Sequence, residues 1–248
     1  VPREILMKGP LTANIHSFES LATLDGKGIR YEVFFVGCPF RCAYCHNPDT
    51  WEGEGLRMTV DELVKKLVRY KPYFGKDGGV TLSGGEVLTQ SAFAAQLIPA
   101  LHDKGINVAV DTCGGVPLTD AVKTVLRVAD MVILDVKFHT EDDYRKYCRG
   151  SLQTVMNTLA YLESVNARVW IRTVVVPGIN DTKEDIAEYA RLIKFYKCVE
   201  RWQLLAFHTM GFAKYRKLGI VNPLEGTPAL SKDRLKELQA YADKAMEG

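Results

Sequence analysis

The sequence of 248 residues is 47% hydrophobic and 25% charged, which suits one large globular domain or a single α/β barrel and excludes a disordered chain. Its 32 basic and 30 acidic residues leave a formal charge of +2, which gives no electrostatic case for nucleic acid as the main partner. No apolar run approaches the ~18 residues of a membrane span. Six cysteines without a paired framework favour a reducing compartment. Residues 1–7 contain neither an initiator methionine nor a long apolar core, so we expect a processed or trimmed N-terminus.

Short apolar runs alternate with helical patterns from residue 29 onward, which predicts a parallel sheet with crossover helices. The six predicted strands cover residues 29–36, 79–82, 107–110, 131–136, 168–175 and 201–206. Predicted helices include one that opens with a capping box at Thr59, the segments 90–104, 152–165 and 183–197, and a last one that Ser231 caps. Six such units are too few for a complete eight-stranded barrel, so we expect an α/β fold of the partial (β/α)6 TIM-like kind.

Polar residues follow the predicted strands at the edge where such sheets carry their active sites. The residues at these strand ends are Cys38 after the first, Ser83 to Glu86 after the second, Asp111 and Thr112 after the third, Asp135 and Lys137 at the fourth, and His208 after the sixth. Polar groups gathered on one rim are costly unless they bind something, so we expect a ligand there.

Cys38, Cys42 and Cys45 form a C-x3-C-x2-C triplet directly behind the first predicted strand. Three thiolates so close together can hold one face of a compact cluster, whereas a closed zinc or iron–sulfur site needs four ligands. The other three cysteines are isolated along the chain. The triplet therefore predicts a [4Fe–4S] cluster with one open iron, and a disulfide-bearing or zinc-binding loop is the alternative.

The triplet, with the aromatic Tyr44 before its last cysteine, resembles the signature of the radical SAM superfamily. The resemblance implies that S-adenosylmethionine chelates the open iron and is cleaved by one electron to a 5′-deoxyadenosyl radical. Gly84, Gly85 and Glu86 match the G-G-E motif of that superfamily, which implies that they hold the methionyl amine. Taken alone, the segment suits a tight turn with a solvent-exposed glutamate equally well.

Asp111 and Asp135 end two adjacent strands, and two ionised carboxylates on one rim repel unless a cation lies between them. The residues around them resemble those of glycyl-radical-enzyme activases. This resemblance implies a monovalent cation, held by the two carboxylates and nearby carbonyls, with Thr112 and Ile133 as candidates. The alternative is an ion pair of one aspartate with Lys137 while the other aspartate faces solvent.

Arg172 interrupts an otherwise buried strand, and a buried guanidinium requires an anionic or multiply accepting partner. We expect the cofactor's ribose or carboxylate, and a structural ion pair with a neighbouring strand is the alternative. By resemblance only, the backbone of Val176 would meet adenine. His46 and His208 are candidate pocket residues, although a lone histidine is as often structural. Cys113 is expected to be a small packed residue.

Residues 23–30, with the sequence T-L-D-G-K-G-I-R, resemble the T-x-D-G-P-G-I-R segment of the pyruvate formate-lyase activating enzyme family, and Lys27 replaces the proline of that family. Together with residues 15–20 and 45–51, the likeness spans nearly the whole chain. It implies removal of a glycine Cα hydrogen from a glycyl radical enzyme, most simply pyruvate formate-lyase, with Asp25 near the entering glycine loop. We expect one radical SAM domain over residues 1–248: an N-terminal extension and substrate-side loop (1–28), the core (29–208), and a C-terminal loop and helix (209–248).

The resemblance implies a cytoplasmic monomer of anaerobic metabolism, with flavodoxin or ferredoxin as electron donor and with no membrane partner. The basic run of residues 214–217 is a candidate docking site for an acidic partner or an electron donor, although a solvated turn is the simpler interpretation. Two alternative functions remain: a radical SAM enzyme that acts on a small molecule, and an iron–sulfur electron carrier or redox sensor. The second does not explain the G-G-E loop or the carboxylates at the rim.

Overall fold

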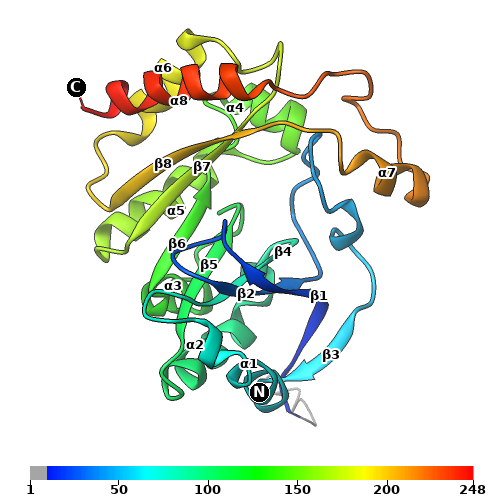
Figure 1. Cartoon of the computed structure of the whole chain (residues 1–248), viewed down its shortest axis with the longest axis vertical. Coiled ribbons are helices and arrows are strands. Elements are labelled where there is room, and N and C mark those ends of the chain that lie inside the picture. The colour runs from blue at the N-terminus through cyan, green and yellow to red at the C-terminus, as the bar shows by residue number, and fades with distance from the viewer. Residues whose placement is uncertain (1–9, 248) are drawn as a thin grey trace, which may run out of the picture.

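The computed structural model describes residues 10–247 of the chain, and the expectation of a trimmed N-terminus concerns residues 1–7, outside this range. The sheet has eight strands in the order β3-β1-β2-β4-β5-β6-β7-β8 and stays open, with β3 and β8 at its edges (Figure 1). Among residues 10–247, no helix combines the length and apolar character needed to cross a membrane.

Six neighbouring strands of the sheet are parallel. They are β2 (Arg30–Phe35), β4 (Gly79–Gly84), β5 (Asn107–Thr112), β6 (Met131–Asp135), β7 (Val169–Val175) and β8 (Val199–Ala206). Each overlaps one of the six predicted strands, because all but β8 are mostly buried on both faces and show as continuous apolar runs in the sequence. The predicted partial (β/α)6 barrel is confirmed.

Helices cover the outer face of the curved sheet (Figure 1). They are α1 (Val60–Val68), α2 (Ser91–His102), α3 (Asp120–Val128), α5 (Leu152–Ser164), α6 (Lys183–Ile193) and, beside β8, α8 (Lys232–Glu247). The side chains of Thr59, Thr119, Ser151 and Thr182 accept a backbone hydrogen bond in the first turn of α1, α3, α5 and α6. The shorter α4 (Glu141–Asp143) and α7 (Phe212–Leu218) lie in the loops after β6 and β8.

Two antiparallel strands, absent from the prediction, extend the sheet beyond β2. β1 (Thr12–Ala22) pairs with β2 and with β3 (Leu56–Thr59). Only Ala13 and Ile15 of β1 are buried, so this strand lacks the continuous apolar run that marks the central strands. The segment expected to be an N-terminal extension therefore supplies one strand of the sheet.

The inner face of the sheet has two layers, because side chains alternate along each strand. Nearer the strand starts, four apolar side chains form a small cluster of their own: Ala109, Met131, Ile133 and Trp170. Two residues further along the same strands come Asp111, Asp135 and Arg172, which line a cavity. The apolar layer thus closes the barrel below the polar layer.

Candidate active site

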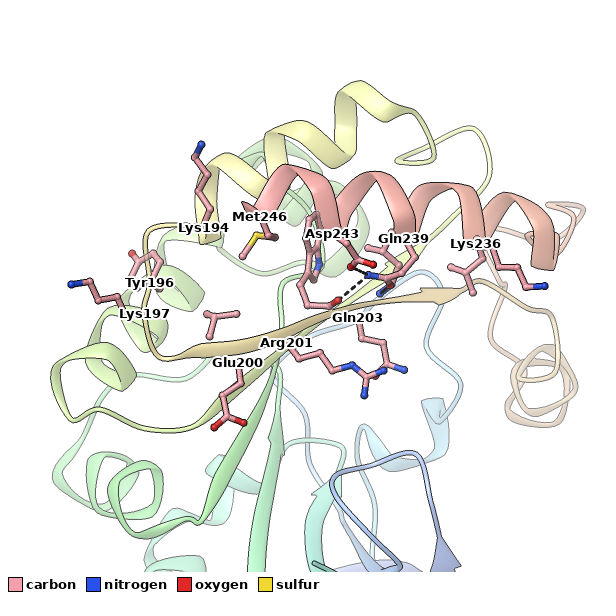
Figure 2. A pocket seen from close by; sticks show the side chains of 14 residues that line it. Lys194, Tyr196, Lys197, Glu200, Arg201, Gln203, Lys236, Gln239, Asp243 and Met246 are labelled. Carbon is pink, nitrogen blue, oxygen red and sulfur yellow. Dashed lines mark hydrogen bonds between the residues drawn. The ribbon is translucent and has the colours of Figure 1, made fainter. Parts of the chain in front are cut away.

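A cavity of about 380 Å³ lies at the carboxyl ends of the parallel strands. The predicted site residues that line it are Asp25, Cys38, Cys42, Tyr44, Cys45, His46, Gly84, Gly85, Asp111, Thr112, Asp135, Lys137 and Arg172. Four predicted residues do not line it: Glu86, Ile133, Val176 and His208. A larger cavity of about 710 Å³, between β8 and α8, contains none of the predicted residues (Figure 2).

The cysteine loop follows β2 and is fixed by backbone hydrogen bonds to a segment far along the chain. The amide of Arg41 donates to the carbonyl of Cys148 at 2.8 Å, and the amide of Ala43 to that of Tyr147 at 2.7 Å. All six cysteines are free thiols. Burial raises the pKa of Cys45 to about 12, and the positive charge of a metal is what would stabilise such a thiolate.

Two of the isolated cysteines lie against the triplet, which the sequence did not indicate. Cys38 accepts a hydrogen bond from the thiol of Cys113, and this bond lowers the pKa of Cys38. Cys42 donates a hydrogen bond to Cys148, and this bond together with burial raises the pKa of Cys42. Cys113 is buried, as expected of a packed residue, but it also lines the cavity.

Glu86 is turned into the protein rather than toward the cavity. Its carboxylate is 1% exposed and accepts hydrogen bonds from the amide of Leu88 at 2.9 Å, the hydroxyl of Thr112 at 2.7 Å and the amide of Cys113 at 2.7 Å. Burial raises the pKa of Glu86. The structure therefore gives this side chain an internal role in joining the ends of β4 and β5.

The two glycines of the same turn do face the cavity, and the packing leaves no room for side chains. A Cβ on Gly84, whose φ is +115°, would lie 2.1 Å from the backbone nitrogen of Phe35. A Cβ on Gly85 would lie 2.4 Å from the carbonyl oxygen of Gly37. Only glycine permits this approach, which leaves bare backbone at the cavity.

The two rim aspartates have different partners. Asp135 pairs with Lys137 at 2.7 Å, whereas Asp111 accepts a hydrogen bond from the hydroxyl of Ser83 at 2.7 Å. Burial and then the charge of Asp135 raise the pKa of Asp111 to about 7. Within residues 10–247, no three His, Cys, Asp or Glu side chains converge on one point where a single metal ion could bind, and the cation stays a prediction.

Arg172 reaches across the barrel to the loop between β1 and β2. Its guanidinium pairs with Asp25 at 2.6 Å and donates to the carbonyl of Leu24, so its partner is a loop rather than a neighbouring strand. Glu32 and Glu19, which sequence reasoning missed, line the cavity as well. Burial and then the hydrogen bond with Asp25 raise the pKa of Glu32 to about 10. Glu32 could have been predicted as a site residue, because it is a glutamate within the apolar strand β2.

The remaining candidates lie at the border of the cavity or away from it. The rings of His46 and His208 stack with centroids 3.8 Å apart, and burial and then His208 lower the pKa of His46 to about 4. Val176 uses its amide for the side chain of Asn180 and its carbonyl for the following turn. Ile133 belongs to the apolar layer beneath the cavity.

The residues of the cavity fit the groups that the cysteine pattern implies. Four buried polar atoms of the lining lack a hydrogen-bond partner among the described residues: Oε1 of Glu32, the hydroxyl of Tyr44, Nε2 of His46 and Nε of Arg172. An unpaired buried polar atom costs ~1–3 kcal/mol, so a polar ligand gains by meeting these atoms. Three free thiols, bare glycine backbone and these atoms together suit an iron–sulfur cluster with a polar cofactor.

Comparison with known proteins identifies the class and then the family. Residues 33–193 match the family model of the radical SAM superfamily, and the open parallel sheet with its cysteine triplet is a domain of that class. The chain is 42% identical over 236 residues to the pyruvate formate-lyase-activating enzyme of Clostridium pasteurianum, covering 94% of this chain and 98% of that protein. It is 38% identical over 234 residues to that of Streptococcus mutans, covering 91% and 89%. The chain belongs to the family of pyruvate formate-lyase-activating enzymes, and its superfamily implies a [4Fe–4S] cluster and S-adenosylmethionine.

Solved structures share the fold. SuiB of Streptococcus suis bound to the precursor peptide SuiA aligns with a TM-score of 0.67 at 15% identity, covering 85% of this chain and 44% of that chain. A domain of pyruvate-formate lyase-activating enzyme from Bacteroides vulgatus aligns with a TM-score of 0.56 at 18% identity, covering 68% and 94%. At such low identity these likenesses bear on the fold alone.

Proposed function

We propose that this chain activates a glycyl radical enzyme, pyruvate formate-lyase or a relative, by removing a Cα hydrogen from one of its glycines. The observation that carries the proposal is the cavity in which three free thiols, bare glycine backbone and a layer of charged side chains meet. The near-complete alignment with pyruvate formate-lyase-activating enzymes supports this substrate class. A cluster and S-adenosylmethionine bound in the cavity would supply the carbon-centred radical that takes the hydrogen.

In this proposal each residue of the cavity has a distinct task. Cys38, Cys42 and Cys45 would each bind one iron and leave the fourth open. The backbone at Gly84 and Gly85 would contact the methionyl group of the cofactor, and the unpaired Nε of Arg172 would donate to its oxygens. This arrangement is supported by the free thiols, by the absence of room at the glycines, and by the buried Nε without a partner.

We also propose a monovalent cation between Asp111 and Asp135. The carboxylate of the cofactor would be the third negative group in this buried place, where Lys137 pairs with Asp135 and Arg172 is already paired with Asp25. The raised pKa of Asp111 supports the need for further positive charge.

For the wider organisation we propose that residues 1–28 form the substrate side, residues 29–208 the catalytic core and residues 209–248 a C-terminal loop and helix. The ion pair of Asp25 with Arg172, which ties the loop after β1 to the cavity, supports the first assignment. A monomer that receives its electron from a flavodoxin or ferredoxin completes the proposal.

The experiment uses pyruvate formate-lyase deuterated at glycine Cα. Reduced holoenzyme with S-adenosylmethionine should place deuterium in 5′-deoxyadenosine, measured by mass spectrometry. Cys38→Ala should lose the cluster and the transfer, whereas Cys198→Ala, a buried cysteine that does not line the cavity, should keep both. Cofactor cleavage without transfer from any glycyl radical enzyme would favour a small-molecule substrate. No cleavage at all would favour an electron carrier or sensor.

A further inference from the structure

A second cavity lies on the outer side of the cysteine loop. It has a volume of about 540 Å³ and is lined by that loop, by Lys146, Tyr147 and Arg149, and by side chains of the segment 215–223. Cys42 and Trp51 line both this outer cavity and the site cavity. The same two side chains therefore separate the proposed cluster position from a cavity on the other side.

The rim of the outer cavity carries two positive charges that are not in ion pairs, although the ammonium group of Lys146 lies over the ring of Tyr147. Lys146 and Arg149 are exposed, and neither forms an ion pair with a carboxylate among residues 10–247. The two carboxylates of the rim are already paired with other cations, Asp49 with Lys214 and Glu52 with Arg41. Two uncompensated cations thus remain where an approaching anionic surface would meet them.

Exposed apolar side chains also line the outer cavity. Leu218, Ile220 and Val221 are 47%, 36% and 85% exposed. The segment that carries them is anchored on the cysteine loop, because the ring of Tyr215 lies edge-on to Trp51 and its hydroxyl donates to the carbonyl of Cys42 at 3.4 Å. Exposed apolar side chains beside unpaired charges are typical of a surface that binds another protein.

The basic run at 214–217, a candidate docking site from the sequence, is only partly available. Lys214 turns inward to Asn47 and Asp49, and Arg216 lies 3.8 Å from Glu225. The free cations come instead from the loop before α5, which sequence alone did not bring to this place.

The site cavity offers no free positive charge. Five carboxyl groups line it, against two cationic side chains that are both paired: Glu19, Asp25, Glu32, Asp111 and Asp135, against Lys137 and Arg172. An acidic protein would therefore find no cation to meet at that mouth, which the proposed function assigns to the glycine segment of the substrate. The outer cavity is therefore the approach to the cysteine loop that favours an acidic protein.

We propose that the outer cavity is the docking surface for a small acidic protein that donates one electron, and that Cys42 and Trp51 form the wall through which this electron passes. The inference rests on the proposed function, which requires one external electron for each cofactor cleaved. The donor is oxidised by one electron and the cluster reduced by one, and no bond forms or breaks in this step.

The experiment measures reduction of the reconstituted holoenzyme in a stopped-flow instrument, with the reduced cluster confirmed by electron paramagnetic resonance. The probe is a fully reduced flavodoxin, and a photoreduced deazaflavin is the small reductant that needs no docking surface. The test variant is Lys146→Glu with Arg149→Glu. The matched control, Lys65→Glu with Arg69→Glu, makes the same charge change at two exposed residues that line neither cavity.

We expect the second-order rate with flavodoxin to fall at least tenfold in the test variant at low ionic strength, and its dependence on salt to weaken. Val221→Asp should lower the same rate, and deazaflavin should reduce every variant at the wild-type rate. Flavodoxin rates that are equal in the test and control variants would overturn the proposal. The proposal would also be overturned if the test variant lost reduction by both flavodoxin and deazaflavin, which would point to damage at the cluster. It would be overturned as well if the test variant bound the glycyl radical enzyme more weakly while its rate with flavodoxin was unchanged. If deazaflavin cannot reduce the wild-type protein, the result would instead contradict the proposed function itself.

Discussion

Replacing Glu86 with glutamine separates a role in the fold from a role in cofactor binding. The carboxylate accepts two hydrogen bonds at one oxygen, from Leu88 and Thr112, and a third at the other oxygen, from Cys113. Glutamine can keep the first two, but it turns its NH₂ group toward the amide of Cys113. One hydrogen bond to a charged group is then lost, worth ~1.5–3 kcal/mol, and relief of the buried charge offsets part of this loss.

We therefore expect Glu86→Gln to lower the free energy of unfolding by ~2 kcal/mol. Glu86→Ala leaves three buried donors without an acceptor and should lower it by ~4 kcal/mol or more. Urea titration followed by tryptophan fluorescence measures both. The control is Glu62→Gln, at an exposed carboxylate that also bonds a backbone amide, and it should change stability far less. If Glu86→Gln leaves stability intact and weakens S-adenosylmethionine binding more than tenfold, the carboxylate serves the cofactor and the internal role is wrong.

Three further predictions concern the cavity and the cysteine loop. Burial and the charge of Asp135 raise the pKa of Asp111 from 3.8 to about 7, so between these values the folded protein keeps a proton that the unfolded chain loses. The free energy of unfolding should therefore fall as the pH rises from about 4 to about 7. Asp111→Asn should flatten that slope in urea titrations, and an unchanged slope would assign the proton to another group. Asp25→Asn leaves the buried guanidinium of Arg172 without its carboxylate and should cost ~3 kcal/mol by the same measurement, and no loss would mean that the pair does not form in solution. Phe40→Ala should cost ~3–5 kcal/mol, because its ring fills the space beside Gly115 and Gly150, and a loss below 1 kcal/mol would contradict that packing.

The sequence was sufficient to predict the parallel strands of the core, but not the antiparallel strands β1 and β3 at one edge of the sheet. Strands β4 to β7 are buried on both faces, so their residue types alone reveal them. β1 gains its place from pairing with β2 and β3, and its side chains are mostly half-buried or exposed. Pairing of this kind depends on distant segments and leaves no local pattern.

Strand ends predicted which segments meet, but not which way each side chain turns. Asp111 and Asp135 reach the cavity because alternation fixes their direction. Glu86 follows β4 in a turn, where no alternation holds, and it finds buried donors near the end of β5. The approach of Cys113 and Cys148 to the triplet depends likewise on loops that join distant elements.

The two layers inside the barrel explain why so many charges can gather at one end of it. Ile133 and Trp170 belong to the apolar layer below, so the polar layer has no water on that side. Burial is therefore the first cause of the raised pKa values of Asp111 and Glu32, and neighbouring carboxylates add to it. A cofactor that carries a sulfonium and an ammonium group would relieve this repulsion on binding, and part of its binding free energy would then come from charges that the barrel holds apart from solvent.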